Sequence, residues 1–504
     1  MRIPFPERIP INRVALFAAA LFAVQQFEGT PLYFSASSVA FLLIATLAFN
    51  TAGGLTRTAG VYVFFYSMMD VVIGLFYKAY LGEPADSNLL DPHTTILAFL
   101  GSITSMFAAV IVSRRFARRP GVLQNILIDA NMYRASVGCI VFGIAGGFII
   151  SLLGSGGNAL LSAFTQLDQL IPLGIIVGVM HEIRRSGGTR STNMTITLAA
   201  GFYFLYWGLL GYSKQGMLEP VVCWALPVCV MRYRLSRLQV VLGLCGVFIL
   251  FYYLVPYSQY GRNANQDENP TFGQKLQTSI DLLEHPNRTR QKYLEATAGD
   301  VGGYFNSPQG FWDRLQFISI DDSRINVTDQ GKVVGLGPLK EQLLNTVPHI
   351  IWPGKPPPRY GGNYYTHEIN NQPFDEGDTT TGISFSPTAE AYHVAKWVGI
   401  FVVAPFIWLV LFIFYDWLIG DIRATPWGLL VFAQLSHTAP EGMLSGLIHF
   451  LTFDTEIFIF CALFATWVAP LFAIAVLGPD RRRPAIRFAF QAPLAHRQAT
   501  DEHA

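Results

Sequence analysis

A long polar region in the middle of the chain contains the residues best suited to acid–base chemistry. Glu390 and His393 lie three residues apart, so their side chains share one face if the segment is helical. A carboxylate or an imidazole can take the proton from a hydroxyl group as that hydroxyl attacks a substrate. We therefore predict that Glu390 and His393 are catalytic and that one of them is the general base.

The same region supplies cations that a departing phosphate group would need. Guanidinium and ammonium groups can neutralise the charge that develops on a leaving diphosphate where no metal does so. Among these cations we assign this catalytic role to Arg314, because its position matches the family resemblance described below. Four further residues are predicted to bind substrate, namely Arg324, His349, Lys355 and Arg359.

A metal site is the competing interpretation of the histidine and acidic residues between positions 349 and 378. His367 and Glu368 lack the second histidine, four residues on, that a zinc-peptidase motif contains. Residues 375–378 lack the alternating oxygen ligands and the closing glutamate of a calcium loop. All five cysteines lie in apolar segments, so the polar region has no thiolate ligands. We expect neither a metal nor another cofactor.

Composition indicates that a membrane protein carries these residues. The 504-residue chain is 51% hydrophobic and 14% charged, whereas soluble domains contain about 25% charged residues. Apolar runs of about 20 residues cross a bilayer as helices, because hydrocarbon cannot hydrate a backbone. We predict an all-α polytopic protein with twelve spans, at residues 12–27, 31–50, 59–78, 94–113, 134–154, 159–181, 193–212, 217–231, 237–256, 396–418, 426–449 and 455–478.

The distribution of basic residues predicts the orientation of these spans. Arginines gather in alternate loops, as at residues 114–119 and 481–483, while the intervening short loops contain little beyond Lys78 and Lys214. Since basic residues stay on the cytoplasmic side, both termini should be cytoplasmic. We therefore divide the chain into three parts, a nine-helix membrane region (1–256), a large periplasmic loop with the candidate site (257–394), and a three-helix membrane region with a cytoplasmic tail (395–504).

Turn and proline signals predict short helices inside the periplasmic loop. A polar helix is expected over residues 272–295, with an interruption at His285-Pro286. Two shorter helices are expected at 308–318 and 339–346. Glycine, asparagine and aspartate residues between 361 and 382 predict a flexible segment ahead of the tenth span.

Three segments of the loop resemble the O-antigen polymerase (Wzy-type) family of bacterial oligosaccharide repeat-unit polymerases. An arginine-bearing segment at 310–324 is followed by the matching stretches Val347-Pro348-His349, Ile351-Trp352-Pro353, Lys355-Pro356, and Ala389-Glu390-Ala391-Tyr392 with Gly399. The family pattern usually has an arginine at the position of His349, and commonly a glycine at that of Lys396. The resemblance implies a metal-independent membrane glycosyltransferase. Such an enzyme joins undecaprenyl-diphosphate-linked repeat units into O-antigen, capsule or exopolysaccharide at the outer leaflet of the inner membrane.

The resemblance also implies partners, and two alternative functions stay open. The implied partners are an undecaprenyl-diphosphate-linked oligosaccharide, membrane lipid, and a chain-length regulator or export machinery. A net charge of +1 without a basic stripe argues against nucleic acid. An O-antigen ligase shares the topology and the carrier, and His367 with Gly377 and Thr380 is close to its motif. A polysaccharide flippase or other transporter is the alternative of another class, although no internal repeat is visible.

Overall fold

The computed structural model of this chain is built from helices, which agrees with the predicted all-α class. It describes residues 1–117, 120–153, 166–264, 272–297, 303–307, 312–347, 352, 354–356, 359–370, 372–373 and 382–478. Within these ranges no β-strand is present. His349 is the one predicted site residue that lies outside them.

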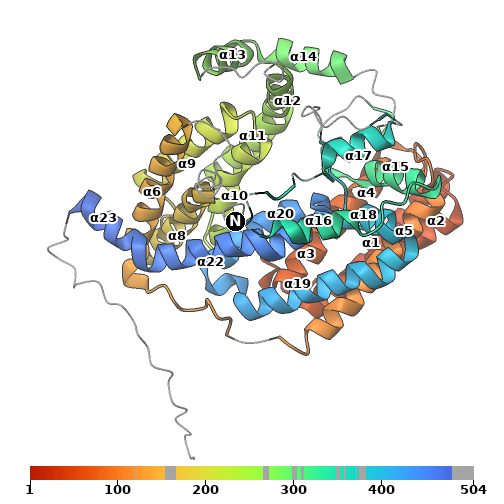
Figure 1. The fold of residues 1–504 in the computed structure, drawn as a ribbon, viewed down its shortest axis with the longest axis horizontal. Helices are drawn as coiled ribbons and strands as arrows, with labels where there is room; N and C mark the ends of the chain where they lie inside the picture. The colour runs from red at the N-terminus through yellow and green to blue at the C-terminus, as the bar shows by residue number, and fades with distance from the viewer. Residues whose placement is uncertain are drawn as a thin grey trace, which may run out of the picture.

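Helices from the first half of the chain form most of the bundle drawn in Figure 1. They are α1 (Ile11–Phe27), α2 (Leu32–Ala52), α3 (Thr58–Ser67), α4 (Ile73–Leu81), α5 (Pro92–Ser113), α6 (Met132–Leu153), α8 (Leu170–Arg185), α9 (Met194–Tyr203), α10 (Lys214–Val230), α11 (Arg237–Ile249) and α12 (Val255–Ala264). Single π-helical turns join α3 to α4 and α11 to α12, so that each pair forms one continuous helix.

The polar region and the C-terminal part contribute the remaining helices. They are α13 (Phe272–Glu284), α14 (Pro286–Thr297), α15 (Ile318–Asp329), α16 (Gly337–Asn345), α17 (Gly362–Ile369), α18 (Pro387–Val398), α19 (Ala404–Leu418), α20 (Pro426–Glu441), α21 (Met443–His449), α22 (Thr455–Leu463) and α23 (Ala469–Leu477). In Figure 1, α13 and α14 lie at one end of α12, while α15 and α17 lie near α18.

Seven continuous helices in the described ranges are long and apolar enough to cross a membrane. Their bounds are Leu32–Ala52, Thr58–Leu81, Pro92–Ser113, Asp129–Ile149, Arg237–Arg262, Pro387–Ala424 and Met443–Leu477. Two shorter apolar helices, Ile11–Phe27 and Met194–Leu209, accompany them. The chain is therefore a multi-pass membrane protein.

The boundary between the last two predicted spans lies elsewhere in the structure. Residues 426–449 were expected to form a single helix, but α20 ends at Glu441 and α21 continues into α22 and α23. Met443 has a φ of +55°, and its amide donates a hydrogen bond of 3.2 Å to the carbonyl oxygen of Phe385. A Cβ atom at Gly442 would lie 2.4 Å from the carbonyl oxygen of Thr438, so this break requires glycine.

Inside the polar region, the sequence predicted some helices correctly and misplaced others. The expected interruption at His285-Pro286 separates α13 from α14, because proline is tolerated at the first turn of a new helix. In the described part of the helix expected at 308–318, that prediction is wrong, since Trp312–Leu315 forms only a 3-10 turn and α15 begins at Ile318. The segment expected to be flexible between 361 and 382 contains α17.

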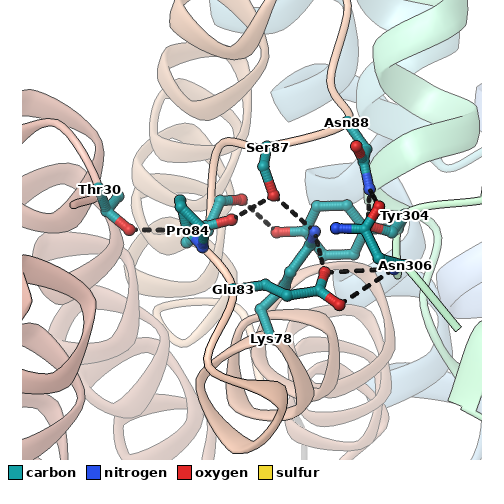
Figure 2. Close-up of polar contacts among 9 residues, drawn as sticks. Thr30, Lys78, Glu83, Pro84, Ser87, Asn88, Tyr304 and Asn306 are labelled. Carbon is teal, nitrogen blue, oxygen red and sulfur yellow. Dashed lines mark hydrogen bonds and ion pairs between the residues drawn. The ribbon is translucent and has the colours of Figure 1, made fainter. Parts of the chain in front are cut away.

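A buried ion pair fastens residues 303–307 to the first half of the bundle (Figure 2). Lys78 is fully buried, and its ammonium group donates to Glu83 at 2.6 Å and to the hydroxyl of Ser87 at 2.7 Å. Glu83 also accepts a hydrogen bond of 3.1 Å from the backbone amide of Asn306, and the Lys78 ammonium lies 4.8 Å from the ring centre of Tyr304. Residues 303–307 are thus held against the end of α4 and the loop that follows it.

Asp322 makes a second connection between the polar region and the bundle. Its carboxylate accepts hydrogen bonds from the amides of Leu90 and Asp91, at 2.5 and 3.0 Å, and from the hydroxyl of Thr95 at 2.8 Å. Three donors from the start of α5 therefore hold one residue of α15. This contact fixes α15, which carries Arg324, relative to the membrane helices.

We expect Lys78→Ala to destabilise the protein by about 3 kcal/mol, because the partly buried carboxylate of Glu83 loses its cation and the buried Lys78 side chain is removed. The measurement is thermal unfolding of the purified protein in detergent. Lys292→Ala, which removes an exposed lysine on α14, is the matched control and should change the midpoint little. Equal midpoints for the two variants would contradict the structural role of Lys78.

Candidate functional site

Arg324, Glu368 and His393 meet at the junction of α15, α17 and α18. The Nη1 atom of Arg324 donates a hydrogen bond of 2.6 Å to Oε2 of Glu368, and Nε2 of His393 lies 3.5 Å from the same oxygen. Arg324 and His393 are 1% and 0% exposed. Two residues predicted from the sequence are therefore brought together by Glu368, a carboxylate that was not predicted as a site residue.

Aromatic and hydroxyl groups hold this triad in place. The guanidinium carbon of Arg324 lies 4.3 Å from the ring centre of Tyr365, an arrangement that favours a cation. Nδ1 of His393 lies 2.9 Å from the hydroxyl oxygen of Thr328. The imidazole is thus oriented from one side by α15 and faces Glu368 with its other nitrogen.

The beginning of α18 is fixed by a hydrogen-bonded cap. The hydroxyl of Ser386 accepts hydrogen bonds from the amides of Thr388 and Ala389, and Pro387 occupies the first turn. The amide of Ser386 in turn donates a hydrogen bond of 2.9 Å to Asp321 on α15. The first turns of α18 are consequently locked to α15, which explains why His393 and Arg324 keep a fixed relationship.

A kink ends the site-bearing part of α18. Lys396 has a φ of +47° and interrupts the helical geometry, and its ammonium donates a hydrogen bond of 3.0 Å to Asp329. Glycine adopts a positive φ more easily than other residues. In this chain a lysine adopts the positive φ, and an ion pair with Asp329 holds its side chain.

A cavity of about 350 Å³ opens beside Glu368. Cations, an aromatic ring and a carboxylate share its lining, which consists of Lys332, Arg359, Tyr364, His367, Glu368, Gln372 and Pro373. The predicted residue Arg359 is in this lining, with its guanidinium carbon 5.8 Å from the ring centre of Tyr364. Such a lining suits a ligand that has both sugar and phosphate groups, since it offers a ring face, hydrogen-bond donors and positive charge.

The charge of Glu368 is set by competing effects on its pKa. Burial raises the pKa of Glu368, but the nearby imidazole of His393 and the charge and hydrogen bond of Arg324 lower it by more, so the net pKa is below the usual value. Burial lowers the pKa of Arg324, although Glu368 opposes this effect. Glu368 therefore remains ionised at neutral pH and can accept a hydrogen bond or a proton from a ligand.

Glu390 is almost completely buried and has a different environment from Glu368. Its oxygens accept hydrogen bonds from the hydroxyl of Tyr365 at 2.9 Å, from the amide of Ser445 at 2.6 Å and from the hydroxyl of Ser445 at 2.9 Å. It is absent from the cavity lining. Glu390 connects α18 to α17 and α21, so in the structure it positions the helices that form the site.

Arg314 and Lys355 also lie apart from the triad. The Nη2 atom of Arg314 donates a hydrogen bond of 3.4 Å to the hydroxyl of Tyr293 on α14. The ammonium of Lys355 donates to the carbonyl oxygens of Asn345 and Val347, at 3.2 and 3.0 Å. Lys355 thus satisfies carbonyl groups at the end of α16, a common position for a lysine.

Comparison with protein-family models, with curated proteins and with solved structures found no match to this chain. In the part of the chain that the structure describes, no group of three or more histidine, cysteine, aspartate or glutamate residues could hold a metal ion.

Proposed function

We propose that this protein is a polysaccharide polymerase that transfers a glycan from a polyprenyl diphosphate carrier to a lipid-linked repeat unit. The observation that carries the proposal is the Glu368 carboxylate, held by Arg324 and His393, in a cavity that also contains Lys332 and Arg359. A proton acceptor and cations in one cavity are what a transfer with a diphosphate leaving group needs.

In the proposed reaction, a hydroxyl oxygen of the acceptor sugar attacks the anomeric carbon of the donor glycan. The bond from that carbon to the diphosphate oxygen breaks, and the diphosphate leaves with the electron pair. Glu368 takes the hydroxyl proton, while Lys332 and Arg359 neutralise the charge that grows on the leaving group. Arg324 and His393 act by keeping Glu368 ionised and oriented, and Tyr364 offers a ring face to a sugar.

The proposal includes the twelve-span topology, with both termini in the cytoplasm and the polar region on the outer face of the inner membrane. The alternating arginine clusters support this orientation. A periplasmic enzyme reporter fused near Asn306 should be active, and the same reporter fused after Arg487 should be silent. Equal activity at both fusion points would contradict the orientation.

The lipid-linked sugars of a bacterial strain that lacks the protein test the function. Single repeat units on the carrier are expected, because elongation would be lost while their synthesis continues. Complementation with the intact gene should restore long chains. Repeat units trapped on the cytoplasmic side would indicate a flippase instead.

An O-antigen ligase is the second candidate, because His367 lines the same cavity as Glu368. A ligase would transfer the finished glycan to a lipid A core rather than to another repeat unit. The same deletion strain would then accumulate full-length chains on the carrier. The length of the carrier-bound glycan therefore distinguishes the two enzymes directly.

A further inference from the structure

A second candidate site lies between α14 and the helix formed by α11 and α12. An apolar groove of about 400 Å³ runs there, lined by Leu244, Val247, Phe248, Phe251 and Leu294 among others. The helix from Arg237 to Arg262 is the least enclosed of the seven apolar helices. Only 6% of its most apolar window is buried, against 39–67% in the other six. Hydrocarbon is therefore the natural occupant of this groove.

One arginine lines the α14 side of the groove, and a second contacts a residue of that lining. Arg290 is part of the lining, and its guanidinium carbon lies 4.0 Å from the ring centre of Tyr252, another lining residue. Tyr293 also lines the groove, and its hydroxyl accepts the hydrogen bond from Arg314. Arg290 therefore lines the groove itself, whereas Arg314 lies next to the lining residue Tyr293.

The charge of Arg314 acts on two other basic residues, Lys214 and Arg262. The pKa of Lys214 is lowered to about 7 by its burial and by the positive charges of Arg314 and Arg262, while Glu441 acts in the opposite direction. Arg262 donates from Nε to the carbonyl oxygen of Tyr212 at 3.1 Å. Gathering like charges is unfavourable without a counter-charge, and it is a common feature of anion-binding sites.

We propose that this groove and its cations bind the polyprenyl diphosphate of the acceptor substrate. The isoprenoid chain would lie against α11, and the diphosphate would contact Arg290 and Arg314. A diphosphate carries more negative charge than the single phosphodiester of a zwitterionic phospholipid, so it matches several cations better. The assignment to the acceptor rests on the proposed function, whereas the binding of a lipid diphosphate does not.

We assign the groove to the acceptor carrier rather than the donor carrier, because the groove and the cavity beside Glu368 share no lining residue. The donor diphosphate must lie beside the reacting carbon, and therefore near Glu368, Lys332 and Arg359. The acceptor hydroxyl belongs to the far end of a repeat unit, so its carrier lies one oligosaccharide away from the chemistry. Arg314 accordingly holds the acceptor carrier, rather than neutralising the leaving group as the sequence predicted.

Native mass spectrometry of the purified full-length protein with sugar-free polyprenyl diphosphate tests the site. Arg290→Ala combined with Arg314→Ala should lose one bound carrier, with affinity at that site reduced by about 10-fold or more. Arg288→Ala, which removes an exposed arginine from the same helix, is the control and should bind like the wild type. In an elongation assay, the double variant should need a correspondingly higher concentration of lipid-linked repeat unit.

Two outcomes would overturn the proposal. One is unchanged carrier binding in the double variant, and the other is displacement of the carrier by phosphatidylglycerol at an equal concentration. If the wild-type protein does not polymerise glycans but the double variant still loses one bound carrier, the lipid diphosphate site stands and the polymerase function is rejected. Leu294→Trp, which fills the groove without changing charge, should reduce carrier binding independently of the arginines.

Discussion

Glu368→Gln should lower the turnover of glycan elongation by about 100-fold or more, because general acid–base catalysis by a positioned side chain contributes about 10²–10⁴-fold. Glutamine keeps the shape of the side chain and one oxygen for the hydrogen bond from Arg324. It cannot take the proton from the acceptor hydroxyl. The measurement is the rate of chain extension by the purified protein with lipid-linked repeat units at saturating concentration.

The control for this substitution is Glu284→Gln, at an exposed position on α13. It makes the same chemical change outside the cavity, so elongation should continue at the wild-type rate. Binding of lipid-linked substrate should be largely kept in Glu368→Gln, since the cations of the cavity are unchanged. A variant Glu368→Gln that elongates normally would remove Glu368 from the chemistry and return attention to His393.

The membrane character of this chain was predictable from the sequence, because the apolar runs are long and glycine- and arginine-rich turns separate them. The break at Gly442 was not predictable in the same way. It depends on a hydrogen bond between Met443 and Phe385, two residues that lie far apart in the sequence. Hydropathy describes each segment alone and contains no information on such pairings.

The candidate site was predictable by residue type, whereas its geometry was not. Arg324 and His393 were named from the sequence, but Glu368 was assigned to a flexible segment because glycine and asparagine residues flank it. A weak signal for α17 existed, since Tyr365 and Ile369 are four residues apart and pack together with Phe385. The sequence favoured Glu390 as the base over Glu368. Their roles differ in burial and in hydrogen-bond partners, and these properties exist only in the folded protein.

Arg324→Ala should abolish most elongation and also change its pH dependence. The substitution removes the 2.6 Å ion pair, and breaking a buried pair costs about 3–5 kcal/mol of stability. It also removes the charge and the hydrogen bond that lower the pKa of Glu368, so burial raises that pKa. Thermal unfolding and the rate of elongation as a function of pH measure the two effects.

The sign of the pH effect follows from the direction of the pKa shift. In the wild type, the pKa of Glu368 is below its usual value, so the carboxylate loses its charge only at strongly acidic pH. In Arg324→Ala the carboxylate is protonated at a higher pH, and the acidic limb of the rate profile should move upward. Arg324→Lys keeps a positive charge without the planar guanidinium that stacks on Tyr365. The acidic limb of its rate profile should therefore lie between those of the wild type and Arg324→Ala. Identical acidic limbs in all three proteins would show that Glu368 does not control the rate, even if Arg324→Ala is unstable.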